Sequence, residues 1–155
     1  MTDSGPWTND DFHQLSWHDV HVHGFRFESV NEEHGSADLL LDIDYILAWE
    51  SANNALQFTV CKAILRFHSV FGLKFVLDYA TPTAGMCAFS LAGIERESLS
   101  YPTGYSSYRW RLEINWPQGS LEFEAPGFTQ TLVGVPHVQP EQSLGSERRN
   151  GGVAV

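Results

Sequence analysis

WHDVHVHGFRF, the sequence from Trp17 to Phe27, alternates polar and apolar side chains with the two-residue period of a half-buried β-strand. The alternation changes phase at Gly24, so the two valines and the two phenylalanines of this stretch fall on opposite faces. One extra residue at His23 and Gly24, a β-bulge, would return all four apolar side chains to the core side. The polar face of this strand would then carry three titratable side chains: Asp19, His21 and His23.

A second stretch, LLLDIDY from Leu39 to Tyr45, has the same alternation and predicts the neighbouring strand. The polar segment 31–35 between the two stretches ends in glycine and suits a hairpin turn. We expect the phenylalanines of the first strand to face the leucines of the second. With the bulge included, this register gives two cross-strand pairs on the polar face: His23 with Asp42, and His21 with Asp44.

The rest of the chain repeats this pattern of apolar alternation and polar turns. The clearest hairpin joins YRWRLEINW (108–116) to SLEFE (120–124) through Pro117, Gln118 and Gly119. About eight strands without a long helical pattern predict an all-β domain, a single antiparallel β-sandwich or open barrel joined mainly by hairpins. We expect a flexible amino-terminal arm over 1–11, the β domain over 12–138 and a disordered carboxyl-terminal tail over 139–155.

The charge of the chain limits its partners. With 9 Lys and Arg against 19 Asp and Glu, the formal net charge is −10. Nucleic-acid binding requires cations that neutralise phosphates, so nucleic acid is not an expected ligand, whereas a basic partner protein is. No apolar run is long enough to cross a membrane, and the first residues do not resemble a signal peptide. Two cysteines suggest buried thiols rather than a disulfide framework, so we expect a soluble, cytoplasmic protein.

The histidines of the first strand are the most specific chemical feature. Two imidazoles and a carboxylate suit a divalent transition metal, with Asp19, His21 and His23 as candidate ligands and Asp42 and Asp44 as orienting groups. The same pairs would also serve acid–base catalysis, or they would simply stabilise a sheet as cross-strand pairs. No nucleophile motif, phosphate-binding loop or dinucleotide fingerprint accompanies them. A cofactor is therefore not expected, apart from this candidate metal.

Aromatic residues outside the regular core phase suggest a recognition surface. The loop from Ser98 to Tyr108 is rich in Tyr and Ser, which offer large contact areas and adaptable hydrogen bonds. The simpler interpretation is a long hairpin connection that happens to be aromatic. Three tryptophans would line a pocket or an interface, including that of a homodimer, or lie partly buried at a sheet edge: Trp7, Trp17 and Trp49.

Several segments together resemble a bacterial family of small, uncharacterised β-rich proteins, over most of the chain from Phe12 to about Leu144. They are FHxxxWHD (12–19), LxDIDYIxxW (40–49), AxLxFxxV (63–70), YRW (108–110) and GFTQTL (127–132). The LxFxxV segment is also loosely similar to a strand of small immunity proteins of toxin systems. The resemblance implies a bacterial cytoplasmic protein and favours a protein-binding role, and it carries no catalytic residue.

These observations predict a non-enzymatic binding protein, monomeric or homodimeric and immunity-like, that engages a protein partner through an acidic face and the Tyr-rich loop. The alternative is a small metal- or acid–base-dependent enzyme that uses the His/Asp cluster. An enzyme requires a concave pocket on which those groups converge, whereas a binding module requires an exposed aromatic patch. The candidate binding residues are Asp19, His21, His23, Asp42, Asp44, Trp49, Tyr101 and Tyr105.

Overall fold

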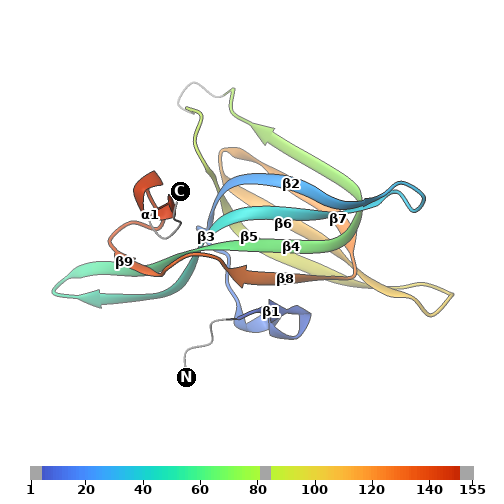
Figure 1. Cartoon of the computed structure of the whole chain (residues 1–155), viewed down its shortest axis with the longest axis horizontal. Coiled ribbons are helices and arrows are strands. Elements are labelled where there is room, and N and C mark those ends of the chain that lie inside the picture. Colours follow the sequence, from blue (N-terminus) through green and yellow to red (C-terminus); the bar gives the residue numbers. More distant parts are fainter. Residues whose placement is uncertain (1–4, 81–84, 151–155) are drawn as a thin grey trace.

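The computed structural model describes residues 5–80 and 85–150, and nearly all of its regular structure is strand. In chain order the elements are β1 (Trp7–Thr8), the 3-10 helix η1 (Asn9–Gln14), β2 (His21–Asn31), β3 (Ser36–Ala52), β4 (Ala55–Asp78), β5 (Phe89–Ser100), β6 (Ser106–Trp116), β7 (Gln118–Ala125), β8 (Gly127–Leu132), β9 (His137–Gln139) and α1 (Ser146–Asn150). The predicted all-β class is confirmed (Figure 1).

The described strands form one antiparallel sheet that closes on itself as a barrel. β3 lies between β2 and β4, β2 continues to β5, β6 and β7, and β7 returns to β4. The 24-residue strand β4 makes this closure possible, because its first part pairs with β3, β8 and β9 while its last part pairs with β7. No helix in the described part of the chain is long and apolar enough to cross a membrane.

The bulge predicted in β2 is present at His23. On either side of it Val22 pairs with Ile43 and Gly24 with Asp42, and the phenylalanines face Leu41 and Leu39 as the sequence indicates. Val22 is buried, but Phe25 and Phe27 are 49% and 50% exposed, so the expectation that they enter the core is wrong. The reason is that β2 pairs with β5 only at its first two residues, which leaves the rest of β2 at an opening in the barrel.

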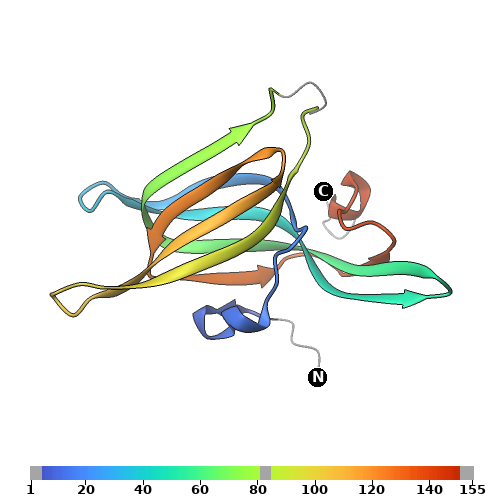
Figure 2. The same ribbon diagram turned by 180° about the vertical axis from the view of Figure 1, so that it is seen from behind.

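The core fills the barrel with large side chains from β4, β6 and β7, among them Phe67, Trp110 and Phe123. The amino-terminal segment covers one side of it, below the sheet in the view from behind (Figure 2). Trp7 on β1 is buried, and the buried indole of Trp17 donates from Nε1 to Gln130 Oε1 at 2.7 Å. These two tryptophans are therefore core residues, unlike the exposed Trp49.

The described part of the predicted flexible arm is structured, since β1 pairs with β8 and η1 follows it directly. Residues 1–4 lie outside the described residues. The two cysteines also differ from each other: Cys61 is buried as expected, whereas Cys87 is exposed, and both are free thiols.

The segment 139–150, expected as part of a disordered tail, packs on the outer face of β3 and β4. Leu144 is buried in a small second cluster with Phe58 and Val60, against which Ile46 packs. This apolar contact and a set of polar contacts to β3 hold the segment in place. The prediction of a disordered tail is therefore wrong for residues 139–150. Residues 151–155 lie outside the described residues.

Candidate functional site

The predicted His/Asp cluster exists, but the chain's own carboxyl-terminal segment covers it. Asp44 lies on β3 opposite His21 and is completely buried. Its Oδ2 accepts hydrogen bonds from the Leu144 amide at 2.9 Å and the Ser143 hydroxyl at 3.1 Å. The imidazole Nε2 of His23 lies 2.6 Å from the same oxygen. Asp44 is therefore an internal anchor for the segment that follows β9.

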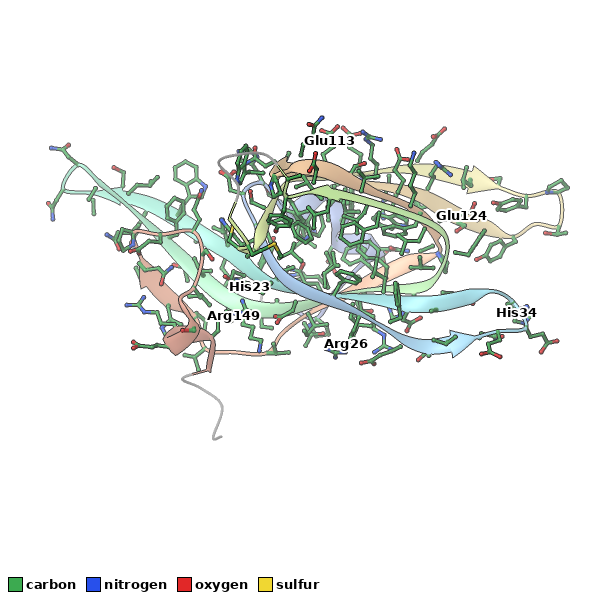
Figure 3. The ribbon with its side chains drawn as sticks, turned by 90° about the horizontal axis from the view of Figure 1, so that it is seen from above. His23, Arg26, His34, Glu113, Glu124 and Arg149 are labelled. Atoms are coloured by element: carbon green, nitrogen blue, oxygen red, sulfur yellow. The ribbon has the colours of Figure 1, made fainter. Side chains whose placement is uncertain are left out.

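The cation of this cluster is Arg149, from α1. Its guanidinium pairs with both Asp42 and Asp44, and the side chain of Arg149 is only 9% exposed. Figure 3 shows the side chains of His23 and Arg149 close together where α1 approaches β2 and β3. The acidic surface expected at Asp42 and Asp44 is thus neutralised largely by the protein itself.

Both histidines of the cluster have lowered pKa values. Burial is the main cause for His23, whose pKa falls from 6.5 to about 4, and Arg149 and Lys62 add repulsion that the carboxylate of Asp42 opposes. The pKa of His21 is also lowered, mainly by burial. At neutral pH the His23 ring is therefore neutral and donates its Nε2 proton to Asp44, while Arg149 supplies the positive charge.

The three candidate metal ligands do not converge. Asp19 has a left-handed backbone conformation with φ of 64°, and its carboxylate accepts from Asn115 Nδ2 at 3.0 Å and Gln142 Nε2 at 3.1 Å. His23 instead contacts Asp44. Within residues 5–80 and 85–150 no group of three or more His, Cys, Asp or Glu side chains is arranged to hold a metal ion.

A groove of about 620 Å³ lies beside this cluster, along the last part of β3. Its apolar lining comes mainly from the β3–β4 hairpin, which projects from one end of the molecule (Figure 2). Trp49, 70% exposed, is opposite Phe58 on β4, and Leu56 lies nearby at the hairpin end. Of the five residues in the predicted His/Asp cluster, only Asp19 lines the groove.

The polar wall of the groove is formed by residues that the sequence-based prediction missed. His18 points its Nδ1 at the Ala92 carbonyl, 3.1 Å away, and its Nε2 lies 3.4 Å from Asp19 Oδ2. Gln142, from the carboxyl-terminal segment, closes the wall through its bond to Asp19. The groove therefore combines aromatic side chains with a polar wall that includes the Asp19 carboxylate, and its described lining residues include neither Lys nor Arg.

One signal in the sequence points to this groove. The turn of the β3–β4 hairpin consists only of Asn53 and Asn54, which have φ values of 52° and 62°. Two consecutive asparagines suit a two-residue turn with positive φ at both positions. That assignment would have extended both strands and placed Trp49 on a projecting hairpin.

The Tyr-rich loop forms the β5–β6 turn, at the end of the molecule opposite the β3–β4 hairpin (Figures 1 and 2). The Tyr101 hydroxyl donates to Glu124 at 2.5 Å, and the rings of Tyr101 and Tyr105 lie 5.9 Å apart. Both rings stay partly exposed. Because the two aromatic surfaces lie at opposite ends, a single small contact cannot include both.

The fold is all-β, its His/Asp cluster is covered by the carboxyl-terminal segment, and the aromatic groove beside the β3–β4 hairpin stays open. No protein-family model, curated protein or solved structure matches this chain. The function is therefore argued from the geometry of the groove.

Proposed function

We propose that this protein is a non-enzymatic binding protein whose partner is a protein that contacts the groove beside the β3–β4 hairpin. The observation that carries the proposal is Trp49, a large aromatic side chain that is 70% exposed in a groove with Leu56 and Phe58. Tryptophan is enriched among the residues that contribute most to protein interfaces, because it buries a large area at a low entropy cost.

The charge of the groove favours a basic partner. The chain has a net charge of −10, and the described residues that line the groove include Asp19 but neither Lys nor Arg. A basic partner would be attracted over long range and would place a cation near this carboxylate. An immunity-like role in the bacterial cytoplasm belongs to this class, and the resemblance noted in the sequence supports it. We assign the Tyr-rich loop at most a second, separate contact.

Site-specific photo-crosslinking in cells of the native host tests this proposal. A photoreactive phenylalanine analogue replaces Leu56 in the groove, Tyr105 in the Tyr-rich loop, or Glu33 in the β2–β3 turn as the control. We expect a discrete crosslinked protein from position 56 and none from position 33. Crosslinks from position 105 alone would move the site to the Tyr-rich loop. Equal labelling at all three positions would reject a specific partner.

A second candidate, the small acid–base enzyme, is favoured by one observation: His18 and Asp19 form an imidazole–carboxylate pair in the wall of the same groove. This candidate requires a small molecule in the groove rather than a protein. Native mass spectrometry of the protein purified from host cells separates the two candidates. A bound small molecule that is absent from a His18→Gln variant would favour the enzyme.

A further inference from the structure

We propose that the groove receives an extended, basic segment of the partner as an added β-strand along the open edge of β3. The open edge is the side of residues 45–52 that faces away from β4. This inference rests on the proposed function and specifies how the partner binds: main-chain hydrogen bonds hold the segment, and the groove selects its side chains.

The backbone of β3 provides the first argument. β2 pairs with β3 from Asn31 only as far as His21, which is opposite Asp44. β4 continues along the other side of β3 to the hairpin turn, with pairs up to Ala52 and Ala55. In the described part of the chain, no strand pairs with the outer side of β3 beyond Asp44. An unpaired strand edge presents a row of N–H and C=O groups that another strand can bind.

The course of the chain before β2 explains why the protein does not fill this edge itself. At Asp19, two residues before β2 begins, the backbone has a φ of 64° and is not part of the strand. Three hydrogen bonds fix this turn: Asp19 N to Leu91 O at 2.8 Å, Val20 N to Trp17 O at 3.1 Å, and Leu91 N to Val20 O at 2.8 Å. Among the described residues, therefore, no strand pairs with this side of β3 from Tyr45 onward, although Ser16 and His18 line the groove beside it.

The groove lies at the edge of the strand rather than on one of its faces. Five consecutive residues line it, from Tyr45 to Trp49. Successive side chains of a strand point to opposite faces, and the register shift between Ile46 and Ala48 interrupts this alternation only once, so a groove that contacts all five residues includes the edge of the strand. An added strand would therefore place alternate side chains on the two sides, one set beside the exposed Trp49 and the other beside the partly buried Leu47.

The open edge has little of the usual protection against strand addition. Natural edge strands are protected by charged side chains such as Lys, by Pro, by β-bulges or by a covering segment. The sequence from Tyr45 to Ala52 is YILAWESA, in which Glu50 is the only charged residue, and the one irregularity is a register shift between Ile46 and Ala48. An exposed apolar edge of this kind is a hazard unless it has a partner. Glu50 and Asp19 make a basic segment the complementary one.

The experiment uses the full-length protein and a displayed library of random octapeptides. We expect enriched peptides that have Lys or Arg beside β-branched or aromatic residues and lack internal Pro. Their affinity should fall at least about tenfold on Trp49→Ala, as expected for a residue that dominates an interface. Glu50→Lys should weaken binding, whereas Glu33→Lys, at the other end of β3, should leave it unchanged.

Backbone methylation tests strand pairing directly. Two versions of the best peptide carry N-methyl groups on alternate amides, one on the odd positions and one on the even positions. In a paired strand alternate N–H groups point to the neighbouring strand, so one version should lose binding and the other should keep it. If both versions bind equally, or both fail, the segment does not pair with β3, and the groove proposal still stands through the crosslink at position 56.

The remaining outcomes are also decisive. If no peptide is enriched, or the enriched peptides bind the Trp49→Ala variant equally well, the strand-addition proposal is overturned. If light scattering shows a dimer that Trp49→Ala separates into monomers, the occupant of the edge is a second copy of this chain rather than a basic partner.

Discussion

The two halves of β3 differ in whether the protein itself pairs the backbone and covers the side chains of the strand. Near Asp44, the strand pairs on both sides, and its outer face carries a carboxylate that Arg149, Leu144 and His23 satisfy completely. From Tyr45 onward, one side of the strand has no pairing strand in the described part of the chain, and Trp49 is exposed. The first half is closed by the protein itself, and the second keeps an unpaired side in the described part of the chain.

This difference shows that a concentration of titratable residues need not mark a binding site. Buried charges are retained only where they are paired and hydrogen-bonded, so a His/Asp cluster on a sheet tends to recruit partners from its own chain. By contrast, none of the described strands pairs with the edge from Tyr45 onward, where Trp49 is exposed. The predictions below test this contrast through the free energy of unfolding, from the largest expected change to the smallest.

Removing the anchor of the closed half should have the largest effect. Asp44→Ala leaves Arg149 and His23 without their buried partner, which we expect to lower the free energy of unfolding by about 3–5 kcal/mol. Urea denaturation measures this change, and hydrogen exchange should show loss of protection at the Leu144 amide, which donates to Asp44. The matched control is Asp42→Ala, whose partly exposed carboxylate should cost about 1 kcal/mol or less. Equal losses for the two variants would contradict the anchoring role of Asp44.

Acid should destabilise the closed half as well. The pKa of His23 is about 4 in the folded protein and 6.5 ordinarily, so the unfolded state binds the proton more readily between these values. The contribution of the neutral His23 ring to the free energy of unfolding is complete above pH 6.5, and it is lost as the pH falls toward 4. At about 1.4 kcal/mol per pKa unit, the loss is at most about 3.5 kcal/mol. The lowered pKa of His21 acts in the same direction.

Urea denaturation at a series of pH values measures this dependence. His23→Gln should remove most of the slope between pH 6.5 and 4, whereas His34→Gln, in the exposed β2–β3 turn shown in Figure 3, should not. A slope that survives His23→Gln would mean that other groups control acid stability.

The sequence predicted the part of the site that depends on local alternation. The phase change around Gly24 predicted the bulge, and the register that sets Phe25 and Phe27 opposite leucines of β3 is confirmed. The cross-strand pair of His23 with Asp42 is wrong, because Gly24 lies opposite Asp42. The exposure of these phenylalanines could not be predicted, because it depends on how few residues of β2 pair with β5. That pairing is a property of barrel closure and has no local signature.

The long-range parts of the site were beyond local patterns for the same reason. Arg149 is separated from Asp44 by 105 positions, in a segment whose polar, Gly-rich composition suggests disorder. Only the apolar Leu144 within that segment hints that it packs. The groove was missed because an aromatic residue near two asparagines resembles part of a turn, although the asparagines alone form it.

In the half of β3 from Tyr45 onward, Trp49→Ala should leave the fold stable while it abolishes the proposed partner binding. Trp49→Ala removes a side chain that is 70% exposed, so we expect the free energy of unfolding to change by no more than about 0.5 kcal/mol. The photo-crosslink between the partner and a photoreactive residue at position 56 should nevertheless be lost. The control is Trp17→Ala, which removes a buried indole bonded to Gln130 and should cost about 3–5 kcal/mol. A large stability loss on Trp49→Ala would show that this half of β3 is also part of the folded core, and the exposed tryptophan would then need no partner to explain it.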